Sequence, residues 1–268
     1  MKAMAPSPFS LALFVPGDRP EWFATAAASQ PDAIILDLED AVAPSAKEAA
    51  RSSLRCDFTH LPVLLRINPV GTPWHEQDLE VAARLPLAAI VVPKAEEVED
   101  LARVALHHRV VALIETARGM ALARDIACSG SVTRLAFGSL DYIADLGCDH
   151  SRNSLQTARA ELVLASRLGG LAAPLDGVTT NVSDGAVVRD DARYAKGLGF
   201  GGKLLIHPRQ VDPTREGFRP TAAEADWARQ VLDSGDGAAK VDGAMVDEPV
   251  RIRARAILAN EGSLKRLD

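Results

Sequence analysis

Two acidic residues stand directly after apolar runs of the kind that form buried strands. Glu115 follows Val110–Ile114, and Asp141 follows Leu135–Leu140. If these runs are adjacent parallel strands, about 4.8 Å apart, the two carboxylates can share one cation. Carboxylate oxygens that leave positions open for water and substrate are the surroundings Mg²⁺ takes in proteins. We therefore predict a Mg²⁺ cofactor bound by Glu115 and Asp141; the alternative is that each carboxylate caps the helix that follows it.

Arg66 is the candidate for binding a carboxylate group. It follows four apolar residues and precedes Ile67-Asn68-Pro69, so its guanidinium is expected to rise from the interior of a barrel into a cavity. A planar guanidinium can grip a carboxylate through two parallel hydrogen bonds. The alternative is a structural ion pair with Glu39 or Asp40. Both roles can hold together, because a neighbouring carboxylate would orient the guanidinium.

Other polar residues also follow apolar runs. Arg19 lies in the loop Val15-Pro-Gly-Asp-Arg19-Pro, where Gly17 allows the backbone to approach a ligand closely. Its cation can meet a phosphate or a carboxylate, or it can form an ordinary salt bridge. The remaining candidates at predicted strand ends are Asp18, Asp37, Glu39, Asp40, Asn68, Lys94 and His207.

The elements that must position these residues follow a regular alternation of strands and helices. Stretches of helical spacing, such as Ser154–Leu168, separate the strand-like runs, and this order means parallel strands with helical crossovers. Eight units in about 200 residues favour a closed (β/α)8 barrel over a doubly wound sheet, and the carboxyl ends of barrel strands form the active-site face. The predicted strands are Leu11–Pro16, Ala33–Glu39, Val63–Pro69, Ala89–Ala95, Arg109–Glu115, Arg134–Leu140, Leu175–Thr180 and Lys203–Pro208.

The C-terminal part has a different pattern. We predict a helix at Ala222–Asp233, a mobile or extended Gly- and Asp-rich connection at Ser234–Gly243, and a last helix at about Pro249–Asn260, whose proline suits a first turn. The expected domains are a barrel over residues 1–220 and a helical extension over residues 221–268 that acts as a lid or an oligomer contact.

Composition narrows the function classes. The chain has 268 residues, is 47% hydrophobic and carries a formal net charge of −6, which is typical of a soluble globular protein with a large core. It has no Lys- or Arg-rich tract, so we expect neither nucleic acid nor a membrane surface as a partner. The three cysteines, Cys56, Cys128 and Cys148, show no disulfide or zinc spacing, which favours a cytoplasmic location.

The segment Gly197–Lys203 matches short phosphate-binding patterns, but in the wrong context. Those patterns need a strand before the glycines and a helix after them, so that backbone N–H groups point at the phosphate. Here a helical stretch precedes the glycines and a strand follows. We interpret the segment as a turn that ends a helix.

Seven strings, taken together in their order and spacing, resemble the citrate lyase beta-subunit-like group of the HpcH/HpaI aldolase family over residues 11–260. The strings are Leu13-Phe-Val-Pro-Gly-Asp-Arg19-Pro, Ile35-Leu-Asp-Leu-Glu39-Asp40-Ala-Val, Arg66-Ile-Asn-Pro, Val92-Pro-Lys94-Ala-Glu96, Ile114-Glu115-Thr-Ala-Arg-Gly119, Phe137-Gly-Ser-Leu-Asp141-Tyr and Lys203-Leu-Leu-Ile-His207-Pro.

The resemblance implies a barrel in which Glu115 and Asp141 bind Mg²⁺ and Arg66 and Glu115 contact the substrate. It implies a CoA-thioester substrate and cleavage or formation of a carbon–carbon bond. It also implies that residues 241–249 cross to an adjacent subunit and supply an acid/base aspartate, which by position is Asp247. Because Ser139-Leu140 replaces the Ala-Glu of the citrate lyase beta subunit proper, we expect a stand-alone homo-oligomer, a trimer or hexamer.

The predicted reaction is cleavage of a 3-hydroxyacyl-CoA of the citryl, malyl or citramalyl type to an α-keto acid and an acyl-CoA. Arg66 would hold the keto-acid carboxylate, and Asp247 would transfer a proton. Glu39 and Asp40 would orient Arg66 and the metal's waters. Arg19 and Lys94 complete the predicted substrate contacts. The alternatives are a thioester hydrolase, a malate-synthase-like activity, and a CoA-binding subunit without activity.

Overall fold

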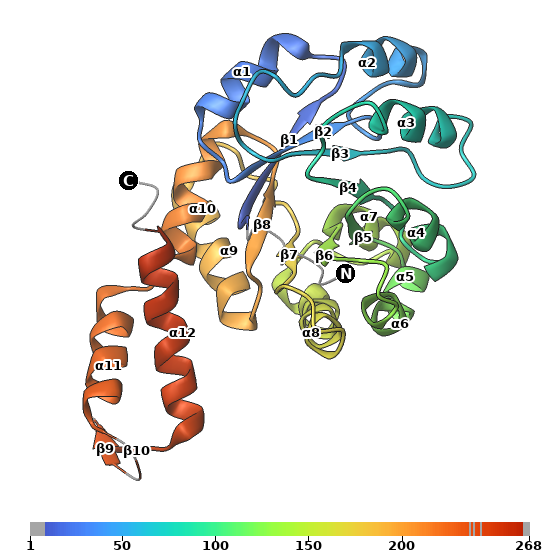
Figure 1. The fold of residues 1–268 in the computed structure, drawn as a ribbon. Coiled ribbons are helices and arrows are strands. Elements are labelled where there is room, and N and C mark those ends of the chain that lie inside the picture. Colours follow the sequence, from blue (N-terminus) through green and yellow to red (C-terminus); the bar gives the residue numbers. More distant parts are fainter. Residues whose placement is uncertain (1–8, 236, 238, 242, 265–268) are drawn as a thin grey trace. The chain divides into compact units, whose positions relative to one another are not determined.

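The computed structural model describes residues 9–235, 237, 239–241 and 243–264 of the chain (Figure 1). The chain divides into two compact units, one ending at Gly217 and one beginning at Phe218. The first unit carries every strand-end candidate of the sequence. Each unit is therefore considered by itself.

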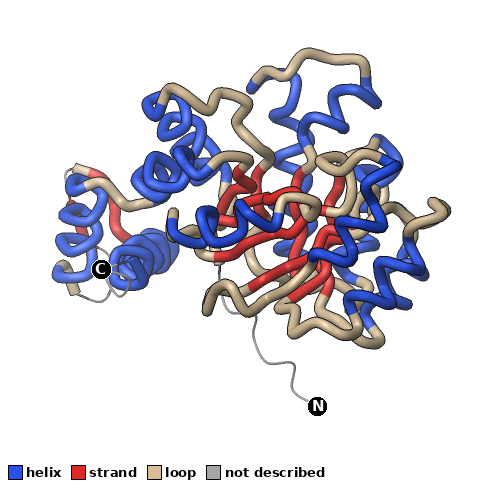
Figure 2. Tube along the Cα trace, turned by 90° about the horizontal axis from the view of Figure 1, so that it is seen from above, coloured by secondary structure: helices blue, strands red, loops and turns tan. Residues whose placement is uncertain are grey.

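The first unit is a closed barrel of eight parallel strands in sequential order, which confirms the predicted (β/α)8 fold. Figure 2 shows the strands at the centre of this unit with helices around them. The strands are β1 (Leu11–Pro16), β2 (Ala33–Asp37), β3 (Val63–Arg66), β4 (Ala89–Val92), β5 (Val110–Ile114), β6 (Arg134–Phe137), β7 (Leu175–Asp176) and β8 (Gly202–Leu205).

The strands are mostly apolar because both of their faces are buried, one in the barrel interior and one against helices. Alternate residues such as Ile35, Leu64 and Leu113 meet in one central cluster. The next inward position on each of these strands, two residues later, falls at the carboxyl rim. Those rim positions hold Asp37, Arg66 and Glu115. The alternation of the strands thus points three polar side chains into the same mouth.

Helices and two short 3₁₀ turns connect the strands. In chain order the elements are α1 (Pro20–Ala28), η1 (Pro44–Ala46), α2 (Lys47–Ser53), α3 (His75–Ala82), α4 (Val98–Ala105), α5 (Ala117–Ala121), α6 (Ala123–Cys128), α7 (Ser139–Leu146), α8 (Arg152–Leu168), α9 (Gly185–Leu198), η2 (Pro208–Gln210) and α10 (Val211–Phe218).

Most strands end earlier than predicted, because the chain leaves the ladder at the carboxyl rim and enters loops. The difference that bears on the site follows β6. The predicted strand Arg134–Leu140 was too long: Ser139 already begins α7, and Gly138 forms the turn between the two elements. Asp141 therefore lies in the first turn of a helix.

The short strand β7 is fixed by a buried ionic network outside the barrel interior. Asp176 accepts hydrogen bonds from Arg159 Nε at 2.8 Å and from Lys203 Nζ at 2.9 Å. Lys203 Nζ also lies 2.9 Å from Asp191 Oδ2. Residues of α8 and β8 bind Asp176 directly, and α9 binds the Lys203 side chain that contacts it. These contacts hold β7 in register although it is only two residues long.

The glycine segment after α9 forms the predicted helix-ending turn. Gly199 caps α9 with φ of 103°, a left-handed conformation that suits glycine. Gly202 then begins β8, where a side chain would overlap the backbone of Ser10. The glycines serve helix termination and close strand packing.

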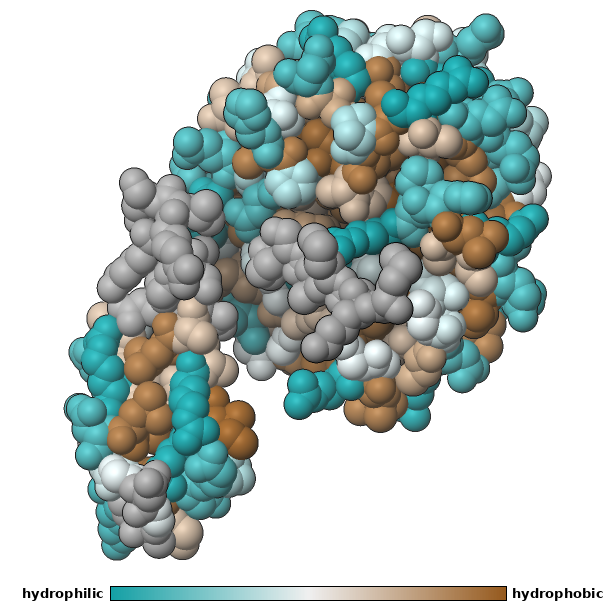
Figure 3. Space-filling model, viewed as in Figure 1, coloured by the Kyte–Doolittle hydropathy of each residue, from teal (hydrophilic) through white to brown (hydrophobic). Residues whose placement is uncertain are grey.

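The second unit contains α11 (Ala222–Asp233), β9 (Ala239–Val241), β10 (Ala244–Val246) and α12 (Glu248–Leu264). Within the predicted connection Ser234–Gly243, residues 239–241 form the extended strand β9, which pairs antiparallel with β10 in a hairpin. Ala228, Val231, Val246 and Ala254 make the core of this unit. Figure 3 shows that apolar side chains also reach its surface.

In the described part of the chain, none of the helices combines the length and hydrophobicity that a membrane crossing requires.

Candidate active site

A cavity of about 350 Å³ opens at the carboxyl ends of the barrel strands. Its polar lining comes from β2, β3, β5 and the start of α7, and its apolar lining comes mainly from β1, β7 and β8. The lining residues are Phe14, Pro16, Asp37, Asp40, Ala41, Arg66, Leu113, Glu115, Phe137, Gly138, Ser139, Leu140, Asp141, Val178, Leu204 and Ile206.

Arg66 is held mainly by Asp37. Its Nε donates to Asp37 Oδ1 at 2.7 Å and its NH2 group to Oδ2 at 2.6 Å, a bidentate pair. Asp37 also accepts the backbone N–H groups of Glu39 and Ala41. Burial alone would lower the pKa of Arg66, but the carboxylates of Asp37, Glu39 and Asp40 raise it above its usual value. The guanidinium is therefore a fixed, permanent cation at the rim.

Glu39 links Arg66 to Lys94. Its Oε2 lies 3.1 Å from Arg66 NH1, and its Oε1 accepts from Lys94 Nζ at 2.8 Å. Burial raises the pKa of Glu39, and the two cations only partly oppose this effect. Lys47 also holds the loop that carries Glu39, because its Nζ donates to the carbonyls of Leu38 and Glu39 at 2.6 and 2.7 Å.

Asp40 sits at the solvent side of this group. Its Oδ2 lies 3.4 Å from Arg66 NH1, and its side chain is 54% exposed, whereas that of Glu39 is 5% exposed. The structural ion pair considered for Arg66 thus exists, and its strongest member is Asp37.

Glu115 is almost fully buried and faces other acidic groups. Burial raises its pKa to about 8, and the charges of Glu39 and Asp141 add to the effect. Its Oε1 accepts the backbone N–H of Lys94 at 2.8 Å. Lys94 has φ of 45°, a left-handed conformation that costs energy for a residue with a side chain. A strained backbone therefore delivers a hydrogen bond to Glu115.

Asp141 forms no hydrogen bond or ion pair with the described residues and is partly exposed in the cavity lining. Neither carboxylate caps a helix: Thr116 caps α5, and α7 starts at Gly138 without a side-chain cap. The capping alternative is therefore not supported. Gly138 leaves room for the Glu115 side chain, because a Cβ there would overlap its carboxylate.

The donor set fits a divalent cation with hard oxygen ligands. The described residues contain no cluster of three or more His, Cys, Asp or Glu side chains arranged to hold a metal. Two carboxylates are nevertheless what Mg²⁺ commonly takes from a protein, with water and substrate as the other ligands. Burial and the charges of Glu39 and Asp141 raise the pKa of Glu115, so an added cation beside it would favour the ionised carboxylate. Mg²⁺ between Glu115 and Asp141 would supply that charge.

Two predicted site residues have their described contacts elsewhere. Arg19 lies 3.7 Å from Glu21 and stacks over Trp22, and it does not line the cavity. Asp247 belongs to the second unit, where its Oδ1 accepts the backbone N–H of Val250 at the start of α12. Lys94 contacts the site in two ways. Its backbone N–H donates to Glu115, and its Nζ donates to Glu39.

His207 also turns away from the cavity, since its Nδ1 accepts the N–H of Arg209. Its neighbour Ile206 lines the cavity in its place. Sequence reasoning included Asp37 among the strand-end residues but gave the orienting role to Glu39 and Asp40. The signal that singles out Asp37 is its place two residues after inward-facing Ile35.

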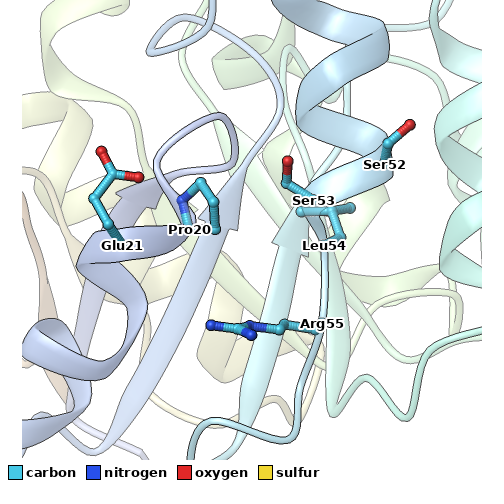
Figure 4. A pocket seen from close by; sticks show the side chains of 6 residues that line it. All are labelled: Pro20, Glu21, Ser52, Ser53, Leu54 and Arg55. Atoms are coloured by element: carbon cyan, nitrogen blue, oxygen red, sulfur yellow. The ribbon is translucent and has the colours of Figure 1, made fainter.

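A second, more open depression lies between the start of α1 and the end of α2. Figure 4 shows Pro20 and Glu21 on one side, Ser53 and Leu54 facing them, and Arg55 nearby. None of the predicted site residues lines it, and it mixes acidic and basic groups without a buried polar centre. The barrel-mouth cavity is therefore the candidate active site.

Fold and site together define a class of protein: a (β/α)8 barrel whose acidic mouth combines a fixed arginine with two carboxylates suited to a divalent cation. The chain belongs to the HpcH/HpaI aldolase/citrate lyase family, whose model matches residues 10–208.

Two curated relatives align with most of this chain. A citrate lyase subunit beta-like protein of Deinococcus radiodurans is 38% identical over 93% of this chain and 96% of its own length. A (3S)-malyl-CoA thioesterase of Cereibacter sphaeroides is 34% identical over 94% of both.

Two solved structures from Mycobacterium tuberculosis are also similar. The protein CitE in complex with magnesium, acetoacetate and coenzyme A has a TM-score of 0.88 and 37% identity, over 96% of this chain and 99% of that one. A citrate lyase beta subunit complexed with oxaloacetate and magnesium has a TM-score of 0.74 and 36% identity, over 81% and 99%.

Proposed function

We propose that the protein is a Mg²⁺-dependent carbon–carbon lyase that cleaves a 3-hydroxyacyl-CoA thioester to an α-keto acid and an acyl-CoA. The observation that carries the proposal is one cavity holding both the Asp37-bound Arg66 and the carboxylates of Glu115 and Asp141. Relatives solved with magnesium, coenzyme A and keto acids support it.

The acidic and the basic residues of the site have different proposed roles. Glu115 and Asp141 would hold Mg²⁺, which when bound acts as a Lewis acid and template for the hydroxyl and carboxylate oxygens of the substrate. Arg66 would bind the substrate carboxylate through NH1, which is not bound to Asp37 and lies 3.1 Å from Glu39 Oε2 and 3.4 Å from Asp40 Oδ2. Asp37 keeps the guanidinium fixed while charge redistributes, so little reorganisation is needed during the reaction.

The reaction consumes no water. The bond between the carbinol carbon and the carbon next to the thioester breaks, and the hydroxyl oxygen loses its proton to a base and becomes the keto oxygen. The carbon next to the thioester carbonyl keeps the electron pair of the broken bond and takes up a proton. We assign the proton transfer to Asp247, by its position in the family pattern, and the orientation of Arg66 to Glu39 and Asp40.

Product analysis tests the proposal. Purified protein is incubated with malyl-CoA and citramalyl-CoA, with and without Mg²⁺, and acetyl-CoA and keto acid are measured. We expect both products in equal amounts, only with the metal. Glu115→Gln and Asp141→Asn are expected to lower kcat/KM about 100-fold or more. The matched control, Asp149→Asn on an exposed loop, should retain wild-type activity. Metal-independent turnover would contradict the proposal.

A thioester hydrolase is the second candidate, because the Cereibacter relative carries that name. Hydrolysis would release free CoA and a hydroxy acid, with one water consumed. Free hydroxy acid as the first product, without a prior keto-acid phase, would favour this candidate.

A further inference from the structure

The two sides of the cavity differ sharply in chemistry. The side built from β2, β3, β5 and α7 carries the charged groups. That side also carries Leu113, Phe137 and Leu140, but the lining residues from β7, β8 and β1, which are consecutive around the closed barrel and form one wall, are all apolar. The members of this wall are Phe14, Val178, Leu204 and Ile206.

The wall is fixed at its open end by one buried side chain. Gln210 accepts the N–H of Ile206 at 2.9 Å and donates to the carbonyl of Thr179 at 2.7 Å. It thereby ties the residue after β8 to the loop that carries Val178. On the other flank the guanidinium of Arg66 lies over the ring of Phe14, 4.7 Å from its centroid. The wall thus borders the position where Arg66 would hold a substrate carboxylate.

Positive charge in the cavity is limited. Among the described lining residues Arg66 is the one cation, and its nitrogens already meet Asp37, Glu39 and Asp40. Lys94 is bound to Glu39, and Lys47 to backbone carbonyls. Five carboxylates (Asp37, Glu39, Asp40, Glu115 and Asp141) face three cations, so a divalent ion just balances them. One substrate carboxylate then has Arg66 and the metal as partners, and a second has no cation left.

We infer that the keto-acid half of the substrate is a monocarboxylate whose remaining substituent is hydrogen or a short alkyl group lying on the apolar wall. This inference rests on the proposed function. Malyl-, citramalyl- and citryl-CoA differ only in one substituent of the carbinol carbon, which is hydrogen, methyl or carboxymethyl. A methyl group gains from burial on the wall, whereas the extra carboxylate of citryl-CoA loses its water there without a charged partner.

The test measures kcat/KM for the three thioesters with excess Mg²⁺. We expect citramalyl-CoA and malyl-CoA to be cleaved and citryl-CoA to react at least 100-fold more slowly than citramalyl-CoA. Ile206→Arg places a cation on the wall and should raise the citryl-to-citramalyl ratio at least 10-fold. Ile206→Met, which adds no charge, and Leu106→Arg, which adds the charge at a residue outside the cavity lining, should leave the ratio unchanged.

A measurement on the unaltered protein covers the case in which Ile206→Arg does not fold. Product inhibition should be at least 10-fold stronger by pyruvate than by oxaloacetate, although a relative was crystallised with oxaloacetate. Citryl-CoA turnover within 10-fold of citramalyl-CoA turnover would overturn the inference and leave the lyase proposal standing. Failure to cleave any of the three would overturn both.

Discussion

At the residue scale, the site depends on a buried ion pair. Arg66 is 9% exposed and Asp37 is 1% exposed, so each depends on the other for a counter-charge. Removing one partner of such a pair leaves an uncompensated buried charge, which costs far more than the pair contributes as a whole.

Arg66→Ala should therefore lower stability as well as activity. We expect a loss of about 3–5 kcal/mol in the free energy of unfolding, measured by urea denaturation. The double variant Arg66→Ala/Asp37→Ala should recover part of that loss, because it removes the stranded carboxylate. Arg55→Ala, at a side chain that is 55% exposed, is the control and should change stability by less than about 0.5 kcal/mol. Additive effects of the two single substitutions would contradict the coupling.

Glu115 gives the metal-free protein a pH-dependent stability. Burial raises its folded-state pKa to about 8 from an unfolded value of 4.5, so between these values only the unfolded state ionises. The contribution of Glu115 to the free energy of unfolding is fully present below pH 4.5 and is lost as the pH rises through 8. The slope contributed is up to about 1.4 kcal/mol per pH unit.

Urea denaturation from pH 5 to 8 in EDTA checks this expectation. The free energy of unfolding of the wild type should fall more steeply with pH than that of Glu115→Gln. Saturating Mg²⁺ should remove the difference in slope, since the ion favours the ionised carboxylate. Parallel curves for the two metal-free proteins would show that Glu115 titrates normally.

At the scale of elements, the turns after β4 and β6 decide where the carboxylates lie. Lys94 accepts a left-handed backbone so that its N–H reaches Glu115, and Gly138 lets α7 begin directly beside that side chain. The site is thus built by loops whose conformations the barrel rim enforces.

Gly138→Ala tests the turn after β6. The new methyl group overlaps the Glu115 carboxylate and must displace it. We expect weaker Mg²⁺ binding, measured by calorimetry, and a fall in kcat/KM of about 100-fold. Gly197→Ala in α9 is the matched control: nothing lies near its added Cβ, and replacing a helical glycine should stabilise the fold by about 0.5–1 kcal/mol. Unchanged metal affinity in Gly138→Ala would refute the role of the turn.

At the scale of the whole molecule, the chain combines a barrel with a second unit of two helices and a hairpin. The barrel cavity contains the binding groups, while the proposed proton-transfer residue, Asp247, belongs to the second unit. We propose that the second unit serves a neighbouring subunit in a homo-oligomer.

Mixing two inactive variants tests that arrangement. Glu115→Gln and Asp247→Asn subunits, denatured together and refolded, should regain up to about one quarter of wild-type activity if intact cavities meet intact aspartates across a symmetric interface. Glu115→Gln mixed with Arg66→Lys is the control and should regain nothing, because both changes lie in the same cavity. No recovery in the first mixture would rule out transfer between subunits.

The sequence by itself determined the barrel and most of its acidic rim. Eight apolar runs separated by helical stretches admit few packings, and residues that follow such runs must gather at one end of a parallel barrel. Glu115, Arg66 and Asp141 were found in this way. Tertiary contacts set the Asp37–Arg66 pair, the place of Asp141 in the first turn of α7, and the apolar wall beside the charges. The physical reason is that such contacts join strands far apart in the chain, so they depend on register and loop conformation, which local residue patterns do not encode.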